Sequence, residues 1–186
     1  MTAGFRRARP EKILVLTGQV HSGKTTFLKR AAASWTSLGL DVGGFLSEVR
    51  CGIRGIEGYD LFDLTEGKST PLLIKGGKPG WTAVGAYRIF PSGLERAAGI
   101  LARDAARDIL IVDEFGPLEL AGLGLRPSFD AAVSAGARCL CVVRLSILEE
   151  FRTNMAARET VIFRLDDPGV LETMTREIVS RKESRG

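Results

Sequence analysis

Residues 18–25 read GQVHSGKT and match the phosphate-loop pattern GxxxxGK[ST], the Walker A motif, in full. The segment before it, residues 12–18 (KILVLTG), is a short run rich in apolar β-branched residues, which is typical of a buried parallel strand. The segment after it, residues 25–38, has apolar residues at helical spacing and stops at Gly39. A strand, a glycine-containing loop and a helix in this order predict a phosphate-binding loop in an α/β fold.

Each residue type in this loop suits a polyphosphate. Gly18 and Gly23 permit backbone torsions that let successive N–H groups converge on phosphate oxygens. Lys24 brings a charge to the β- and γ-phosphates, and the Thr25 hydroxyl is a ligand for Mg²⁺. His21 is expected to be an exposed loop residue. The predicted nucleotide-binding residues are Gly18, Gln19, Val20, His21, Ser22, Gly23, Lys24, Thr25 and Thr26.

The second motif of the chain is acidic and follows the apolar run ILIV at residues 109–112. Asp113 stands where a Walker B aspartate holds Mg²⁺ at the end of a strand. Glu114 comes next and is well placed to deprotonate an attacking water molecule. We therefore predict Asp113 and Thr25 as metal ligands, and Glu114 and Lys24 as catalytic residues. For Glu119, five residues further on, a structural and a functional role are equally compatible with the sequence.

The rest of the chain fits one α/β domain spanning residues 1–186. Residues 1–11 form a polar lead-in, and residues 41–49 form a second strand. Residues 50–90 are rich in glycine and short alternating runs, which predicts an antiparallel hairpin insertion. The α/β rhythm then returns. We predict a P-loop NTPase sandwich with a mainly parallel sheet flanked by helices.

Several helix ends are also predicted. Ser92 is a candidate N-cap, with Glu95 completing a capping box. Asp167 is a candidate cap before Pro168 at the first position of the last helix. The remaining predicted elements are strands at residues 108–114, 138–146 and 160–165 and helices at 92–105, 128–136 and 148–159.

Composition excludes several functional classes. The 186 residues are 45% hydrophobic and 26% charged, as in an ordinary globular protein, and no apolar run is long enough to span a membrane. The net charge of +4 is spread along the chain, which argues against nucleic acid as a partner. The three cysteines form no CxxC and indicate a reducing cytoplasm, with Cys139 and Cys141 on one face of a strand.

Five segments together resemble the small P-loop nucleoside-triphosphatases of the THEP type. They are GQVHSGKTT at residue 18, GGFLSEVR at 43, GYDLFDL at 58, VGAYRIF at 84 and VDEFGPLEL at 112, in the family's order. The resemblance implies a RecA-like fold and slow, Mg²⁺-dependent hydrolysis of several nucleoside triphosphates. It also implies that Glu48 and Arg50, in the EVR element, lie near the site and that Arg50 is a catalytic candidate. As a surface residue of a hairpin, Arg50 would have no such role.

The chain departs from the family's usual pattern at the phosphate loop, after Glu114, and at the end of the strand at residues 138–146. The unusual residues are Gln19, Val20, His21, Phe115, Pro117, Leu118 and Arg144. Arg144 replaces a threonine beside the expected phosphate site. It could contact the phosphate as an internal arginine finger or pair on the surface with Glu149 or Glu150, and the sequence slightly favours the surface pair. These departures point to a diverged branch with a dedicated partner or a narrower role.

Three functional hypotheses follow. The first is a nucleoside-triphosphatase that hydrolyses ATP, GTP and other triphosphates with Mg²⁺. The second is a nucleotide or small-metabolite kinase, with residues 75–80 as a lid. The third is a nucleotide-gated accessory protein with an unidentified protein partner.

Overall fold

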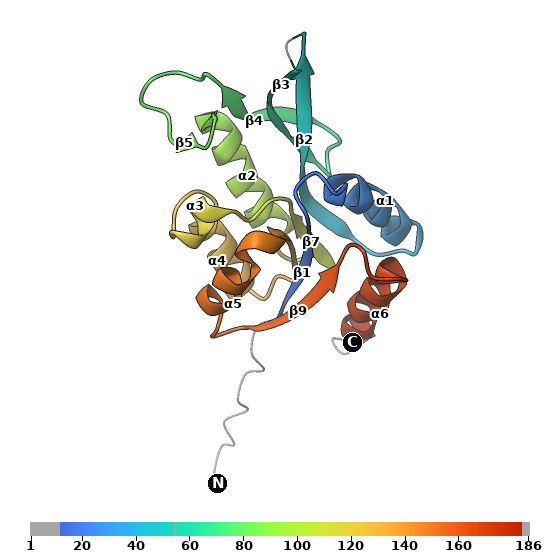
Figure 1. Ribbon diagram of the computed structural model, residues 1–186. Helices are drawn as coiled ribbons and strands as arrows, with labels where there is room; N and C mark the ends of the chain where they lie inside the picture. The colour runs from blue at the N-terminus through green and yellow to red at the C-terminus, as the bar shows by residue number, and fades with distance from the viewer. Residues whose placement is uncertain (1–11, 54, 184–186) are drawn as a thin grey trace.

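The computed structural model describes residues 12–53 and 55–183, so the expected lead-in at residues 1–11 lies outside the described residues (Figure 1). In this part of the chain nine strands form one sheet in the order β5-β6-β4-β3-β2-β7-β8-β1-β9. The strands are β1 (Lys12–Gly18), β2 (Val42–Gly52), β3 (Gly55–Asp63), β4 (Ser69–Lys75), β5 (Ala83–Val84), β6 (Tyr87–Ile89), β7 (Ile109–Val112), β8 (Cys139–Arg144) and β9 (Glu159–Arg164).

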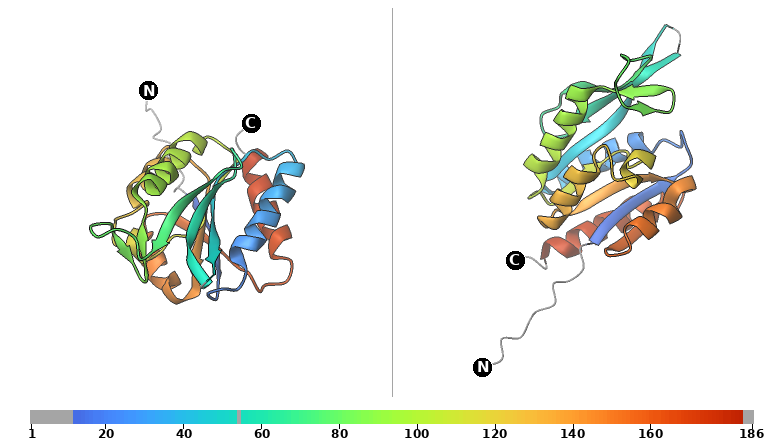
Figure 2. Two further views of the ribbon diagram at one scale, coloured as in Figure 1. Left: turned by 90° about the horizontal axis from the view of Figure 1, so that it is seen from above. Right: turned by 90° about the vertical axis from the view of Figure 1, so that its left-hand side faces the viewer.

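Helices cover both faces of this sheet (Figure 2). They are α1 (Lys24–Ser37), α2 (Pro91–Asp104), α3 (Pro117–Leu120), α4 (Arg126–Ser134), α5 (Leu148–Asn154) and α6 (Val170–Glu183). A 3₁₀ turn at Leu145–Ile147 precedes α5. Helices α1 and α6 pack on one face, and α2 to α5 pack on the other. None of the helices in the described ranges is long and apolar enough to cross a membrane.

Alternation along β1 divides the hydrophobic core into two clusters. Ile13 and Val15 join the cluster beneath α2 to α5, whereas Leu14 and Leu16 join the cluster beneath α1 and α6. Successive side chains of a strand point to opposite faces, so a strand that is apolar throughout must be covered on both. This explains why residues 12–18 form a central strand.

The prediction of a mainly parallel sheet is wrong, because the sheet is mixed. Strands β2, β7, β8, β1 and β9 pair in parallel, and β2 to β6 pair antiparallel. Strand β2 belongs to both halves. Its first residues pair with β7, and from Phe45 onward it pairs with β3. The predicted antiparallel hairpins therefore extend the main sheet at one end, beyond β2.

Two predicted helix starts are also wrong. Helix α2 begins at Pro91 with Phe90 at the N-cap, so Ser92 is inside the first turn. Proline suits the first helical position because the N–H that it lacks would have no partner there. Helix α6 begins at Val170, after Asp167 and Pro168. Helix α3, a single turn directly after the acidic motif, is not among the predicted elements.

Candidate active site

The phosphate loop joins β1 to α1 as the sequence predicts. Gly23 is the N-cap of α1 with φ of 88°, a left-handed conformation that favours glycine. His21 also has a positive φ, 59°, and its side chain is exposed as expected. The first turn of α1 carries no acidic residue, so its free N–H groups keep their attraction for anions.

The Lys24 side chain lies across this loop. Its ammonium group donates to the carbonyl oxygens of Gly18 at 3.2 Å and Gln19 at 2.6 Å. Burial lowers the pKa of Lys24 from its usual value, and the carboxylates of Glu114 and Asp113 oppose that effect. The Lys24 ammonium group is therefore held at the loop, close to the carboxylates of Glu114 and Asp113.

Asp113 connects three segments of the fold. Its Oδ2 accepts a 2.8 Å hydrogen bond from the Thr25 hydroxyl and a 3.2 Å bond from the Ser47 backbone N–H. The residue is only 2% exposed, and burial raises its pKa to about 6 although both hydrogen bonds favour the charged form. These contacts bring the two predicted metal ligands, Thr25 and Asp113, into direct contact.

The donor set at this point fits Mg²⁺. The residues that converge are a hydroxyl and a carboxylate, both hard oxygen donors, and Mg²⁺ usually combines one or two protein oxygens with water and substrate phosphates. No cluster of three or more His, Cys, Asp or Glu side chains that could enclose a metal occurs in the described residues. A site completed by the nucleotide is therefore the arrangement that these residues suit.

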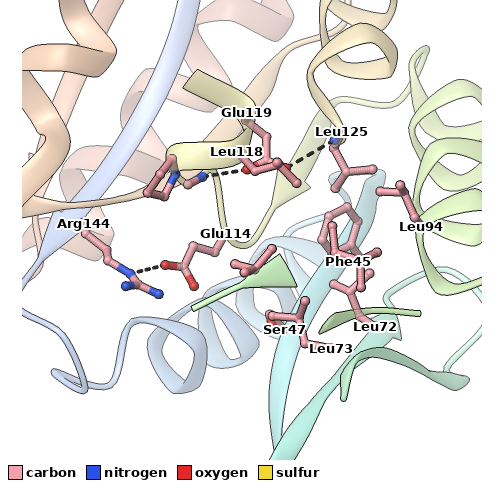
Figure 3. A pocket seen from close by; sticks show the side chains of 14 residues that line it. Phe45, Ser47, Leu72, Leu73, Leu94, Glu114, Leu118, Glu119, Leu125 and Arg144 are labelled. Atoms are coloured by element: carbon pink, nitrogen blue, oxygen red, sulfur yellow. Dashed lines mark hydrogen bonds and ion pairs between the residues drawn. The ribbon is translucent and has the colours of Figure 1, made fainter. Parts of the chain in front are cut away.

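Glu114 extends from the same strand end into the cleft and forms an ion pair with Arg144 (Figure 3). The surface pair of Arg144 with Glu149 or Glu150, which the sequence slightly favoured, is therefore wrong: Glu149 pairs with Arg152 instead. The reason is topological. Strand β8 lies between β1 and β7, so its last residue lies between the phosphate loop and the acidic motif.

These groups line one open cleft with an empty volume of about 830 Å³. The lining residues are Val20, His21, Ser22, Gly23, Lys24, Thr25, Thr26, Ser47, Val49, Tyr59, Asp113, Glu114, Val142 and Arg144. Most of the predicted nucleotide-binding residues are thus brought together with the predicted catalytic acid. Gly18 and Gln19 lie at the base of the loop and border a neighbouring depression.

Sequence reasoning missed Ser47, Val49 and Tyr59. Ser47 and Val49 are two residues apart on β2, so their side chains lie on the same face of the sheet. Tyr59, on β3, is the partner of Val49 in the antiparallel register. The alternation in residues 43–50 shows which side chains share a face of the strand. It does not show that this face borders the cleft, because that depends on β2 lying beside β7.

Three other candidates lie outside the set of residues that line this cleft. Arg50 pairs with Asp60 across β2 and β3 at 2.6 Å, and Glu48 pairs with Lys29 at 2.6 Å. These contacts do not test the catalytic role that the resemblance implies for Arg50. The carboxylate of Glu119 accepts hydrogen bonds from two backbone N–H groups, of Gly116 at 3.0 Å and Leu125 at 3.2 Å.

A second, more apolar pocket adjoins the cleft (Figure 3). Strands β4 to β6 supply one wall, and the segment after Glu114 supplies the other. The two hollows share Ser47, Glu114 and Arg144. The acid–arginine pair therefore stands at the boundary between them.

Comparison with known proteins shows the family to which the chain belongs. The sequence profile of a family described as NTPase matches residues 13–178, and thus nearly the whole chain. The chain belongs to this NTPase family. Among curated relatives, the nucleoside-triphosphatase THEP1 of Methanopyrus kandleri is 43% identical over 109 residues. That match covers 58% of this chain and 59% of the relative.

Other relatives match over longer stretches. The THEP1 protein of Methanocaldococcus jannaschii is 27% identical over 142 residues, with 75% of this chain and 82% of the relative covered. A solved structure described as a human cancer-related nucleoside triphosphatase has a TM-score of 0.67 and 26% identity, and covers 95% of this chain and 98% of its own. The NTPase fold is thus matched across the sheet and both helical layers.

Proposed function

We propose that this protein hydrolyses ATP, GTP and other nucleoside triphosphates to the diphosphate and phosphate, slowly and with Mg²⁺. The observation that carries the proposal is the convergence of Asp113 and Glu114 on the phosphate loop: Asp113 contacts Thr25, and Glu114 lines the same cleft. The family membership and the triphosphatase names of the relatives support it.

The residues divide the chemistry between them. Glu114 accepts a proton from water, the water oxygen bonds to the γ-phosphorus, and the bond to the β–γ bridging oxygen breaks. Lys24 and the N-terminus of α1 stabilise the charge that develops on the departing diphosphate. Thr25 and Asp113 would hold Mg²⁺, which supplies further positive charge at the phosphate oxygens when bound.

A reducing compartment is part of the proposal. Cys139 and Cys141 form no disulfide, and both are fully buried in the core cluster beneath α2 to α5. Buried cysteines outside disulfides are usual in cytosolic proteins, so we infer a cytoplasmic location.

The test is phosphate release from the purified protein with ATP, GTP, CTP and UTP, with and without Mg²⁺. Lys24→Ala and Glu114→Gln should each lower kcat by about 100-fold or more, the usual contribution of a general base or a charge-stabilising group. Glu150→Gln changes an exposed glutamate on α5 and serves as the matched control. Undiminished hydrolysis by Glu114→Gln would contradict the assigned base.

A second candidate function is phosphoryl transfer to a small molecule, and the apolar pocket beside Glu114 favours it. The pocket encloses about 640 Å³ of space, part of it open to solvent, and most of its lining is apolar. Its wall of Leu72, Leu94 and Leu118 suits an apolar molecule with one hydroxyl group near Glu114. Such a hydroxyl would take the place of water as the acceptor.

Labelled phosphate distinguishes the two candidates. The protein is incubated with γ-labelled ATP and a small-molecule extract, and labelled products are separated. A labelled organic product that disappears in Leu72→Arg, while hydrolysis persists, would establish transfer, because the new side chain fills the pocket and leaves the phosphate loop intact. Label in inorganic phosphate alone would leave hydrolysis as the only activity.

A further inference from the structure

Arg144 is the residue of this site whose role neither the family pattern nor the comparisons assign. It ends β8, where it lies opposite Gly18 of β1 in the parallel register. On the other side of β8, the acidic motif follows β7, and the Phe115 N–H bonds the Val142 carbonyl oxygen at 2.8 Å. Arg144 thus lies between the start of the phosphate loop and Glu114.

The contact with Glu114 uses little of the guanidinium group. The Arg144 Nε–H donates to Glu114 Oε1, and this is the one carboxylate that pairs with Arg144 in the part of the chain that the structure describes. A guanidinium group has five N–H donors, so the others remain able to bind an anion. The side chains are 45% and 32% exposed, so neither is locked by surrounding atoms.

A γ-phosphate would compete for this arginine. Arg144 lines the same cleft as the phosphate-loop residues, Lys24 among them. Phosphate oxygens bind guanidinium groups in a two-point geometry, whereas Glu114 engages Nε alone. A triphosphate in the loop therefore offers Arg144 a stronger partner than the carboxylate.

We propose that Arg144 exchanges between Glu114 and the γ-phosphate of a bound nucleoside triphosphate. The exchange moves the guanidinium group to the phosphate and frees the Glu114 carboxylate to accept the proton of the attacking water. A nucleoside diphosphate has no γ-phosphate, so the Arg144–Glu114 pair persists with it. This inference rests on the proposed hydrolysis for its consequence, but the exchange itself concerns binding and is tested separately.

The first test is nucleotide affinity in the Glu114→Gln background. Without the carboxylate, Arg144→Ala cannot act by exposing an unpaired negative charge to the phosphate, so any loss reports direct contact. The probes are ADP and the non-hydrolysable ATP analogue adenylyl imidodiphosphate, each with Mg²⁺, measured by calorimetry. We expect Arg144→Ala to weaken the analogue about 10-fold or more and to leave ADP nearly unchanged. Equal affinity for the analogue with and without Arg144, or an equal loss for both nucleotides, would overturn the proposal.

The second test follows the exchange in the protein with Glu114 present. The Nε–H resonance of Arg144, identified by its absence from the spectrum of Arg144→Lys, is recorded in ¹⁵N-labelled protein. We expect it to move when the triphosphate analogue binds and to stay in place with ADP. A resonance that does not move with the analogue means that Arg144 remains with Glu114, which contradicts exchange.

Controls separate this inference from the proposed function. Arg152→Ala removes another exposed arginine, paired with Glu149 away from the cleft, and should change neither affinity. A protein that shows the exchange but releases no phosphate would refute hydrolysis alone. One that hydrolyses ATP through Glu114 without any contribution of Arg144 to binding would refute the exchange alone.

Discussion

The Thr25 hydroxyl donates a 2.8 Å hydrogen bond to Oδ2 of Asp113, and so joins the phosphate loop to the end of β7. The same oxygen accepts the Ser47 N–H from β2. Three segments far apart in the sequence thereby meet at one carboxylate oxygen.

We expect Thr25→Val to raise the Mg²⁺ concentration needed for half-maximal hydrolysis by about 10-fold or more. Valine has nearly the shape of threonine but no hydroxyl, and a hydrogen bond to a charged group contributes about 1.5–3 kcal/mol. Thr25→Ser keeps the hydroxyl and should remain close to wild type. An Mg²⁺ titration of phosphate release checks both variants, and an unchanged requirement in Thr25→Val would exclude the hydroxyl as a ligand.

Glu119 gives a prediction about stability, because its carboxylate caps the turn that follows the acidic motif. Glu119→Ala should leave the N–H groups of Gly116 and Leu125 buried without a partner, at about 1–3 kcal/mol each. Glu119→Gln keeps one acceptor oxygen, so its free energy of unfolding should fall by about half as much. Urea denaturation measures both changes.

A catalytic role for Glu119 would have a different signature. Glu119→Gln would then lower kcat as strongly as Glu114→Gln while the folded protein stayed stable. We expect kcat to change little in Glu119→Gln, because both carboxylate oxygens already accept backbone hydrogen bonds.

The sequence predicted most of the residues that line the cleft, because local patterns and parallel topology bring them together. The loop at residues 18–25 needs only its glycines and the following helix, and Asp113 and Glu114 follow an apolar strand directly. In parallel strands these ends meet at one edge of the sheet, so the two motifs had to converge. The contact between Thr25 and Asp113 was foreseeable for that reason.

What the sequence could not predict depends on strand order and on pairs across the fold. Strand β2 changes from parallel to antiparallel pairing near Phe45, and nothing in its alternation marks the change. Arg144 has Glu149 and Glu150 nearby in the sequence, yet Glu114, thirty positions away, is its partner. That choice follows from β8 lying between β1 and β7, which a single sequence does not specify.

A buried ion-pair network around Asp104, outside the residues that line the cleft, gives a third prediction. Asp104 is fully buried, and its carboxylate accepts hydrogen bonds from Arg103, Arg107, Thr65 and the Gly44 N–H. Asp104→Asn should lower the free energy of unfolding by about 3 kcal/mol, as expected when one partner of a buried pair is removed. Asp167→Asn, at an exposed aspartate, is the matched control.

This loss should depend on pH. Burial opposes the charged form of Asp104, but its hydrogen bonds hold its pKa well below the usual 3.8. The unfolded chain therefore takes up a proton at a higher pH than the folded chain, and the stabilisation is present above about pH 4 and lost as the pH falls below it. Urea denaturation between pH 7 and pH 3 should show a constant deficit of Asp104→Asn above pH 5 that shrinks below pH 4. A deficit that does not change with pH would mean that the charge of Asp104 contributes nothing.

Arg50 provides the last prediction, because its position and the family pattern disagree about its role. Its guanidinium group pairs with Asp60 at 2.6 Å on the hairpin, and both side chains are partly exposed, so the pair should contribute at most about 1 kcal/mol. We expect Arg50→Ala and Asp60→Asn to have similar, small effects on stability and kcat values close to wild type. An arginine that contacts the transferring phosphate contributes far more, about 10³–10⁵ in kcat. Steady-state hydrolysis by the two variants therefore separates the roles. A large loss of kcat in Arg50→Ala alone would place Arg50 at the phosphate during the reaction. Similar kcat values in the two variants would mean that Arg50 serves only the hairpin.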